Sequence, residues 1–502
     1  MKISIVYYLN LLFFIKHNGG RDGSRAFGLL LPCFPYCCYP CIHYRHSIQK
    51  KGFRGEKNIL FLSVLRYWLC MNMPVPDKKR IEVVDALRGF ALLGIILAHM
   101  NYQYYVGYMP PLHENIGINN AVDARLRNLH IVFVFGKFYS IFSFLFGLSF
   151  GIQMLNAKEK GLAFLRRFAW KLVLLFAIGF LHHMHYGSDV LTIYAVLGFG
   201  LLLFRKTNKR VLLFLAFVFI LNIPGFTYKI INYINSKPGT ERLLAIQSSN
   251  DALKQIQENE ATQYYNIVKK GNYAATLKAN ITYHFKNKFV YQVFNGRLLI
   301  TMGLFFLGLF FARKRFFENL GLHIKAVKQW FWFSTAFCVT LIACYFLFKV
   351  KLYGTVGLFS LVVSFITDTF NMALAIVYFT GFILLFNNKI WQKNLQALVS
   401  IGRMALTTYL IQTILGILIF YGYGFNLLGV IGGEAAFCIG VVIFTAQVYF
   451  SKWWMEDYYY GPLEWFWRSL TYLKVQPLRK SLSGIPRWQN IIFRRLSNMI
   501  KK

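Results

Sequence analysis

Acidic residues are scarce in this sequence. It has 19 Asp and Glu against 56 Lys and Arg, a formal net charge of +37, and only 15% of its 502 residues are charged. Hydrophobic residues make up 56% of the chain and aromatic residues 18%. Because so few charges cannot cover a soluble protein of this length, the composition indicates a polytopic membrane protein.

The basic excess has no accompanying nucleic-acid recognition motif. Lys and Arg stand mostly in short gaps between apolar runs. This placement is typical of a chain oriented in a membrane by the positive-inside rule and attracted to anionic lipid. We therefore expect the lipid bilayer as a partner, and no nucleic acid.

The eight cysteines do not form a disulfide framework. Cys338, Cys344 and Cys438 lie within apolar runs and are expected to be small core residues. Four cysteines cluster between Cys33 and Cys41, but no second Cys/His cluster of zinc-site form follows them. We expect no metal site.

Apolar runs of about 18 residues or more recur from Ile81 onward, each long enough to cross a hydrocarbon core of about 30 Å. They predict an all-α polytopic membrane helix bundle of about ten transmembrane helices. The eighth run is long enough to be tilted, or kinked around Asp368. The runs lie near residues 84–105, 131–155, 168–186, 188–204, 211–229, 291–312, 330–348, 355–386, 398–421 and 425–450.

The gaps between the runs differ in charge. If the segment before Ile81 is cytoplasmic, the inside gaps hold fifteen Lys and Arg and the short outside gaps hold four. This bias predicts that both termini are cytoplasmic. The inside set is Lys158, Lys160, Arg166, Arg167, Arg205, Lys206, Lys209, Arg210, Arg313, Lys314, Arg315, Lys325, Lys328, Lys389 and Lys393, and the outside set is Arg125, Arg127, Lys349 and Lys351.

The rest of the chain divides around this transmembrane domain, expected at 73–460. Residues 1–72 read as an N-terminal extension or as the product of a misplaced start upstream of Met71 or Met73. The polar, helix-prone stretch 230–290 is expected to be an extracytoplasmic helical insert. Residues 461–502 are expected to form an amphipathic, basic cytoplasmic tail that begins with an interfacial helix.

Three ionisable groups stand in the first run: Asp85, Arg88 and His99. Eleven residues separate Arg88 from His99, roughly 20° more than three whole helical turns, so both face the same way at a separation of roughly 16 Å. Such a stripe should face a cavity rather than lipid. The alternative is that Asp85 and Arg88 pair at one membrane interface while His99 lies at the other.

Further polar groups mark the later runs. The motif HHMHYGSD contains His182 and Asp189 and is expected at the same membrane level as His99, where a His can serve as a base or a cap. Asp368 is the most deeply placed acid, either in a structural pair with Arg88 or Arg403 or on a proton path.

Two glycines in the second run, Gly147 and Gly151, have the small-xxx-small spacing of a helix-packing pair. We expect their role to be structural.

Five stretches in order, from about Arg80 to Tyr472, carry a resemblance. They are RIEVVDALRGFALLGIIL, KFYSIFSFLFGLSFGIQM, LLFAIGFLHHMHYGSDVLTIYAVLGF, IGRMALTTYLIQTIL and GPLEWFWRSLTY. Together they resemble the YeiB-like family of bacterial inner-membrane proteins, a domain family of undefined function. The resemblance implies a multi-pass protein of the bacterial inner (plasma) membrane.

The opening helix also resembles that of transmembrane acyltransferases, in some of which an Arg is followed eleven positions later by a catalytic His. This implies an acyl-CoA donor from the cytoplasm, an extracytoplasmic glycan or lipid acceptor, and no bound cofactor. Two alternatives stay open: a proton-coupled transporter or permease, and a non-catalytic membrane interaction protein. The candidate catalytic residues are His99, Arg88 and Asp85, and the candidate substrate-binding residues are His182, Asp189, Asp368 and Arg403.

Overall fold

The structure, a computed structural model, describes residues 80–105, 121–157, 161–235, 259–351 and 356–480. The chain divides into two units, Met1–Arg80 and Ile81–Lys502, and the fold below is that of the second unit. The predicted N-terminal extension, the cysteine cluster between Cys33 and Cys41 and the end of the basic tail lie outside the described residues.

Over these ranges the fold is helical and contains no strand, which confirms the predicted all-α class. Every one of the ten apolar runs contains at least one helix. The helices are α5 (Glu82–Asn101), α6 (Ala121–Phe133), α7 (Phe138–Asn156), α8 (Leu162–His185), α9 (Leu191–Leu203), α10 (Lys209–Ile220), α11 (Ile223–Asn235), α13 (Tyr273–Ala279), α14 (Phe285–Phe294), α15 (Arg297–Arg313), α16 (Leu320–Lys351), α17 (Val356–Asn387), α18 (Lys389–Leu395), α19 (Ala397–Arg403), α20 (Ala405–Phe420), α21 (Gly433–Asp457) and α22 (Pro462–Tyr472).

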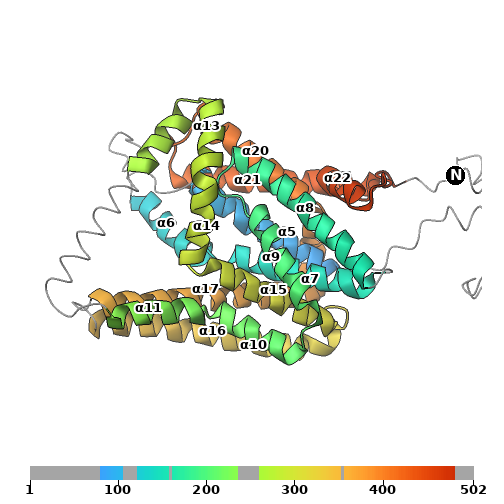
Figure 1. Ribbon diagram of the computed structural model, residues 1–502, viewed down its shortest axis with the longest axis horizontal. Coiled ribbons are helices and arrows are strands. Elements are labelled where there is room, and N and C mark those ends of the chain that lie inside the picture. The colour runs from blue at the N-terminus through green and yellow to red at the C-terminus, as the bar shows by residue number, and fades with distance from the viewer. Residues whose placement is uncertain (1–79, 106–120, 158–160, 236–258, 352–355, 481–502) are drawn as a thin grey trace, which may run out of the picture. The chain divides into compact units, whose positions relative to one another are not determined.

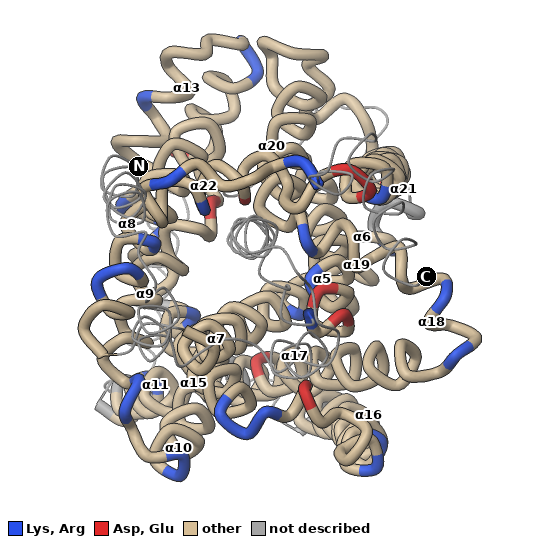
Figure 2. Tube along the Cα trace, turned by 90° about the vertical axis from the view of Figure 1, so that its right-hand side faces the viewer, with Lys and Arg blue, Asp and Glu red and all other residues tan. Residues whose placement is uncertain are grey.

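Several of these helices suit a membrane. Five in the described part of the chain are long and apolar enough to cross one, or eight if each bent helix pair is one span, so the count of ten stays a prediction. The helix α16 leaves large apolar side chains exposed, among them Trp332, Phe333 and Val339. Such a face is adapted to lipid. Basic residues, blue in Figure 2, mark α8, α10 and α16, while few segments are red.

Two predicted spans are not straight helices. The chain bends by 46° between α10 and α11 and by 85° between α19 and α20. Asn222, which has a φ of 49°, is at the first break, and Met404 is at the second. In contrast, α17 runs without interruption through Asp368, where a kink was one expectation.

The bundle is held by close helix contacts. Figure 1 shows α16 and α17 lying along each other, with α10 and α11 beside them. The most extensive contact joins α7 to α15. A Cβ atom on Gly147 would lie 2.1 Å from the Phe305 carbonyl oxygen, and one on Gly308 would lie 2.2 Å from the Phe144 carbonyl oxygen. The predicted packing role of Gly147 is therefore confirmed, and glycines of α15 share it.

The three described cysteines differ in burial. Cys338 is buried in the contact between α16 and α17, as expected of a core residue. Cys344 is half-buried, while Cys438 on α21 is exposed, so the core prediction is wrong for Cys438. An apolar run fixes the residues that a helix contains, but it does not tell which of its faces meets lipid.

The contact at Gly147 can be tested by adding one methyl group. We expect Gly147→Ala to lower the melting temperature in detergent, because α7 and α15 must separate, at a cost of about 1–3 kcal/mol. Gly321→Ala is the control, since no heavy atom lies within 4 Å of the added Cβ. Equal melting temperatures for the two variants would show that this contact is not tight.

Candidate functional site

A large cavity lies inside the helical unit. Its volume is about 1410 Å³, and residues of α5, α7, α8, α9, α14, α15, α19, α20 and α22 line it. Both Arg88 and His99 are on its wall. We call it the central cavity, and we call its two ends the Arg88 end and the His99 end.

The Arg88 end is basic. Arg88 donates hydrogen bonds to Asp85 and, over 2.5 Å, to the Ser149 hydroxyl. Lys171 of α8 also lines this end, with its ammonium 2.7 Å from the Gln153 side-chain oxygen and 4.5 Å from the Trp467 ring centroid. With Arg403 of α19, they form a set of three cations. Such a set can hold an anion, because guanidinium and ammonium groups match phosphate oxygens.

The break between α19 and α20 is capped from a distant part of the chain. Glu464 of α22 accepts hydrogen bonds from the backbone N–H groups of Leu406 and Thr407, over 2.6 Å and 3.0 Å, and from the Thr407 hydroxyl over 2.5 Å. A carboxylate at this place satisfies donors that a helix start leaves free. The amphipathic α22, predicted as an interfacial helix, thus closes part of the Arg88 end with Glu464 and Trp467.

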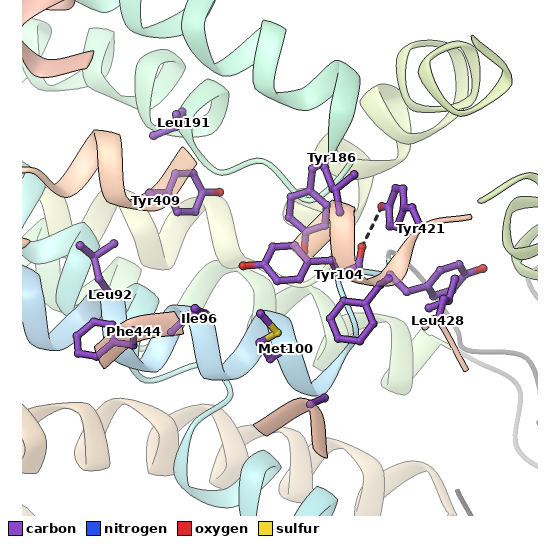
Figure 3. Packing of buried hydrophobic residues seen from close by; sticks show 14 of the residues in the cluster. Leu92, Ile96, Met100, Tyr104, Tyr186, Leu191, Tyr409, Tyr421, Leu428 and Phe444 are labelled. Atoms are coloured by element: carbon purple, nitrogen blue, oxygen red, sulfur yellow. Dashed lines mark hydrogen bonds between the residues drawn. The ribbon is translucent and has the colours of Figure 1, made fainter. Parts of the chain in front are cut away.

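The His99 end is aromatic. His99 shares a 2.5 Å hydrogen bond between its Nδ1 and the Tyr186 hydroxyl, and its ring stacks on Tyr104 with centroids 5.3 Å apart. Figure 3 shows Tyr104, Tyr186 and Tyr409 gathered beside α5, with the Tyr421 hydroxyl donating to the Tyr104 carbonyl oxygen over 3.0 Å. If Nδ1 donates to Tyr186, then Nε2 of His99 is free of its proton and can accept one.

Two buried polar groups at the His99 end point to a ligand. The Tyr409 hydroxyl and the His284 Nε2 find no hydrogen-bond partner among the described residues. Both residues line the central cavity, and their exposed fractions are only 5% and 7%. Leaving such groups unsatisfied is costly, so a molecule with hydroxyl or carbonyl groups would stabilise this end when bound.

The candidate His182 lies in the wall rather than on the cavity surface. Its Nδ1 is 2.8 Å from the Asp189 carboxylate and its Nε2 is 2.9 Å from the Thr413 hydroxyl. Asp189 also accepts hydrogen bonds from Thr192, and the ammonium of Lys288 is 3.7 Å away. This network joins α8, α9, α14 and α20, so its geometry fits a positioning role for His182.

The predicted candidates therefore separate into three groups. Arg88, His99, Asp189 and Arg403 line the central cavity. Asp85 and His182 are not in its lining but bond to Arg88 and Asp189, which are. Asp368 does not join them. It lines a second, smaller cavity. Neither Arg88 nor Arg403, its two predicted partners, is among the lining residues of that cavity.

Sequence reasoning missed several residues of the central cavity. Tyr186 stands inside the HHMHYGSD motif, next to the histidines that drew attention, and its position there was the one available signal. Lys171 and Lys288 belong to no motif recognised in the sequence, and Glu464 stands in GPLEWFWRSLTY as a residue with no predicted role. Their place on the cavity wall depends on contacts with segments far away in the chain.

The apolar helices and the lipid-suited face of α16 define an all-helical, multi-pass membrane protein. The family described as "Protein of unknown function (DUF418)" matches residues 311–474. The chain belongs to this YeiB-like family of undefined function, as the resemblance predicted.

Three relatives illustrate the family. The chain is 29% identical over 432 residues to "Uncharacterized protein YxaH" of Bacillus subtilis, which covers 81% of this chain and 98% of that protein. It is 30% identical over 412 residues to the "Uncharacterized 39.9 kDa protein in amylase 3'region" of Bacillus acidopullulyticus, covering 81% and 97%. It is 38% identical over 89 residues to "Uncharacterized protein YeiB" of Escherichia coli, covering 17% and 22%. No solved structure matches the chain.

Glu464 makes the stability of the Arg88 end depend on pH. The helix α22 is not among the candidate spans. Burial raises the pKa of its Glu464 carboxyl above the ordinary 4.5, against hydrogen bonds from Thr407 and Leu406 that lower it. The folded state therefore binds this proton more tightly than the unfolded chain does. The resulting stability is full below about pH 4.5 and is lost as pH rises through the folded-state pKa.

We expect Glu464→Gln, which is neutral throughout, to gain melting temperature relative to the unaltered protein as the pH rises from about 4 to about 8. Melting curves of both proteins over this range measure the difference. Glu318→Gln is the control for losing a carboxylate, because Glu318 forms an exposed pair with Arg315. A Glu464→Gln difference that does not change with pH would contradict the raised pKa.

Proposed function

We propose that this protein transfers an acyl group from an acyl-CoA donor to an acceptor hydroxyl through the central cavity. The observation that carries the proposal is that Arg88 and His99 line one cavity. The proposal includes a bacterial inner membrane, with the Arg88 end and both chain termini on the cytoplasmic side. The predominance of Lys and Arg in the gaps assigned to that side supports this orientation.

The Arg88 end would bind the phosphate groups of the donor. Along α5, Arg88 and His99 are roughly 16 Å apart, so one donor group cannot touch both. The basic set of Arg88, Lys171 and Arg403 suits phosphates, and the extended arm of the donor would carry its thioester to His99. In this arrangement Arg88 anchors the donor, while Asp85 and Ser149 hold the guanidinium.

The His99 end would carry out the transfer. Nε2 of His99 accepts the proton of the acceptor hydroxyl, and the oxygen attacks the thioester carbonyl. The carbon–sulfur bond then breaks, and the departing thiolate takes the proton from Nε2. The products are an ester and a free thiol, so protons and electrons balance. Tyr186 orients the ring through Nδ1, and the unsatisfied Tyr409 and His284 atoms offer hydrogen bonds to a glycan or lipid acceptor.

A second candidate is a proton-coupled transporter. Three bent helix pairs among the candidate spans favour it, since interrupted spans are common at the binding sites of transporters. Proteoliposomes with a pH-sensitive dye inside test this function directly. Solute-driven proton movement that Asp368→Asn abolishes would promote transport over acyl transfer.

The enzyme function is tested with radiolabelled acetyl-CoA and purified protein, following label into lipid, protein and released acetate. We expect His99→Ala to lower the transfer rate by about 10²- to 10⁴-fold, the usual loss of a general base, while donor binding is kept. Arg88→Gln should instead weaken donor binding by about ten- to a hundredfold.

The matched control is His185→Ala. His185 is an exposed residue at the C-terminal end of α8, and it hydrogen-bonds to Leu181 and Tyr273. It does not line the central cavity. Absence of donor binding and of label transfer by the unaltered protein would overturn the proposal. Equal loss of transfer in His99→Ala and His185→Ala would remove His99 from the mechanism.

A further inference from the structure

A second cavity, of about 120 Å³, lies between α7, α11, α14, α15 and α17. It adjoins the central cavity, and the shared lining residues are Gly136, Tyr139, Tyr291, Asn295 and Arg297. No residue given a role in the proposed acyl transfer lines it. A cavity of about 150 Å³ in a protein core holds a molecule of the size of benzene, so this one admits a small ion. Its polar lining consists of Tyr139, Lys229, Tyr291, Asn295, Arg297, Ser364, Asp368 and Asn371.

Three ionisable charges surround this second cavity: Lys229 of α11, Arg297 of α15 and Asp368 of α17. Within the described residues, no ion pair shorter than 4.0 Å joins Asp368 to either cation. The two cations and the one acid thus stand around the space rather than closing it. With all three groups ionised, their net charge is +1. An uncompensated charge inside a membrane bundle is costly, so a bound anion would stabilise the site.

Each cation is held in place by its neighbours without being neutralised. The Lys229 ammonium donates to the Ser364 hydroxyl over 2.8 Å. The Arg297 guanidinium lies 5.1 Å from the ring centroid of Phe135, 5.4 Å from that of Tyr139 and 5.5 Å from that of Tyr291. A π face attracts a cation more weakly than a carboxylate does, so the positive charge remains available to a ligand.

The backbone adds to this positive field. Arg297 is the first residue of α15, and Ile300 in its first turn also lines the second cavity, so the helix begins there. The start of a helix carries a partial positive charge and free N–H groups. The chain can begin a new helix here because Gly296 has a φ of 66° and packs against Asn222 at the break between α10 and α11.

We propose that the second cavity binds a small monovalent anion, either a halide or a carboxylate of the size of acetate. Lys229 and Arg297 contact the anion, and one negative charge brings the site to neutrality. Asp368 is one helical turn from Ser364, the partner of Lys229, and it competes with the ligand because its carboxylate repels an anion.

The experiment uses the full chain, purified in detergent in a buffer with gluconate as the only anion. Sodium chloride and sodium acetate are titrated in separate arms, and binding is measured by calorimetry. We expect saturable binding of at least one of the two anions. The anion that binds more tightly shows whether the site prefers a halide or a carboxylate. Lys229→Gln and Arg297→Gln should each weaken binding by roughly ten- to a hundredfold. Lys229→Arg, which keeps the charge, should restore most of it.

Asp368→Asn distinguishes an anion from a zwitterion. We expect it to tighten anion binding, because a repulsive charge is removed. Glycine serves as the zwitterionic probe. If glycine binds and Asp368→Asn weakens that binding, the site is one for a zwitterion and the anion proposal is wrong.

Two surface variants control for general charge effects. Lys286→Gln removes an exposed cation on α14 outside both cavities, and Glu318→Gln removes an exposed acid. Neither should change the affinity. Linear, unsaturable heats in both arms would overturn the proposal, as would a loss in Lys286→Gln equal to that in Lys229→Gln. Failure of the anion site would leave the His99→Ala experiment unaffected, because that reaction takes place in the central cavity.

Discussion

An ionised side chain near the centre of a membrane costs at least about 2.5 kcal/mol when it faces hydrocarbon, and this constraint orders the helical unit. Apolar side chains cover the outer face of α16, whereas Arg88, Lys171 and Arg297 turn towards enclosed space. Enclosing these charges requires helices that pack around a cavity without collapsing it. The glycine contact at Gly147 allows α7 and α15 to approach closely and build a rigid wall on one side. The inward placement of these charges and the apolar exterior thus have the same physical cause.

The central cavity joins two chemically different ends, and α5 reaches from one to the other. At the first end, cations and a buried Glu464 meet under the amphipathic α22, close to the 85° break before α20. At the second end, His99 lies among tyrosines, with the Asp189 network behind it. The proposed acyl transfer uses both ends, with the donor bound at the first and the reaction at the second.

Much of the fold could be predicted from hydropathy, since every apolar run contains a helix. The alignment of Arg88 and His99 also followed from the 3.6-residue period, which requires residues eleven apart to share a face. The rest could not be predicted in this way. Glu464 caps a helix start 57 residues earlier at Thr407, and no local pattern indicates such a pairing. The break at Met404 carries no Pro, so the usual sequence signal for a kink was absent there, whereas Pro224 and Gly225 follow the break at Asn222.

By itself, the sequence determined the membrane environment, the helical segments and the face of α5 that carries charge, because these depend on composition and on spacing within one segment. Only the tertiary structure decided which charges meet. It placed His182 behind the wall, bonded to Thr413 across 231 residues of sequence, and it placed Asp368 beside a second cavity with Lys229 and Arg297. Helical periodicity tells which residues share a face, but the neighbour opposite that face is set by how the helices pack.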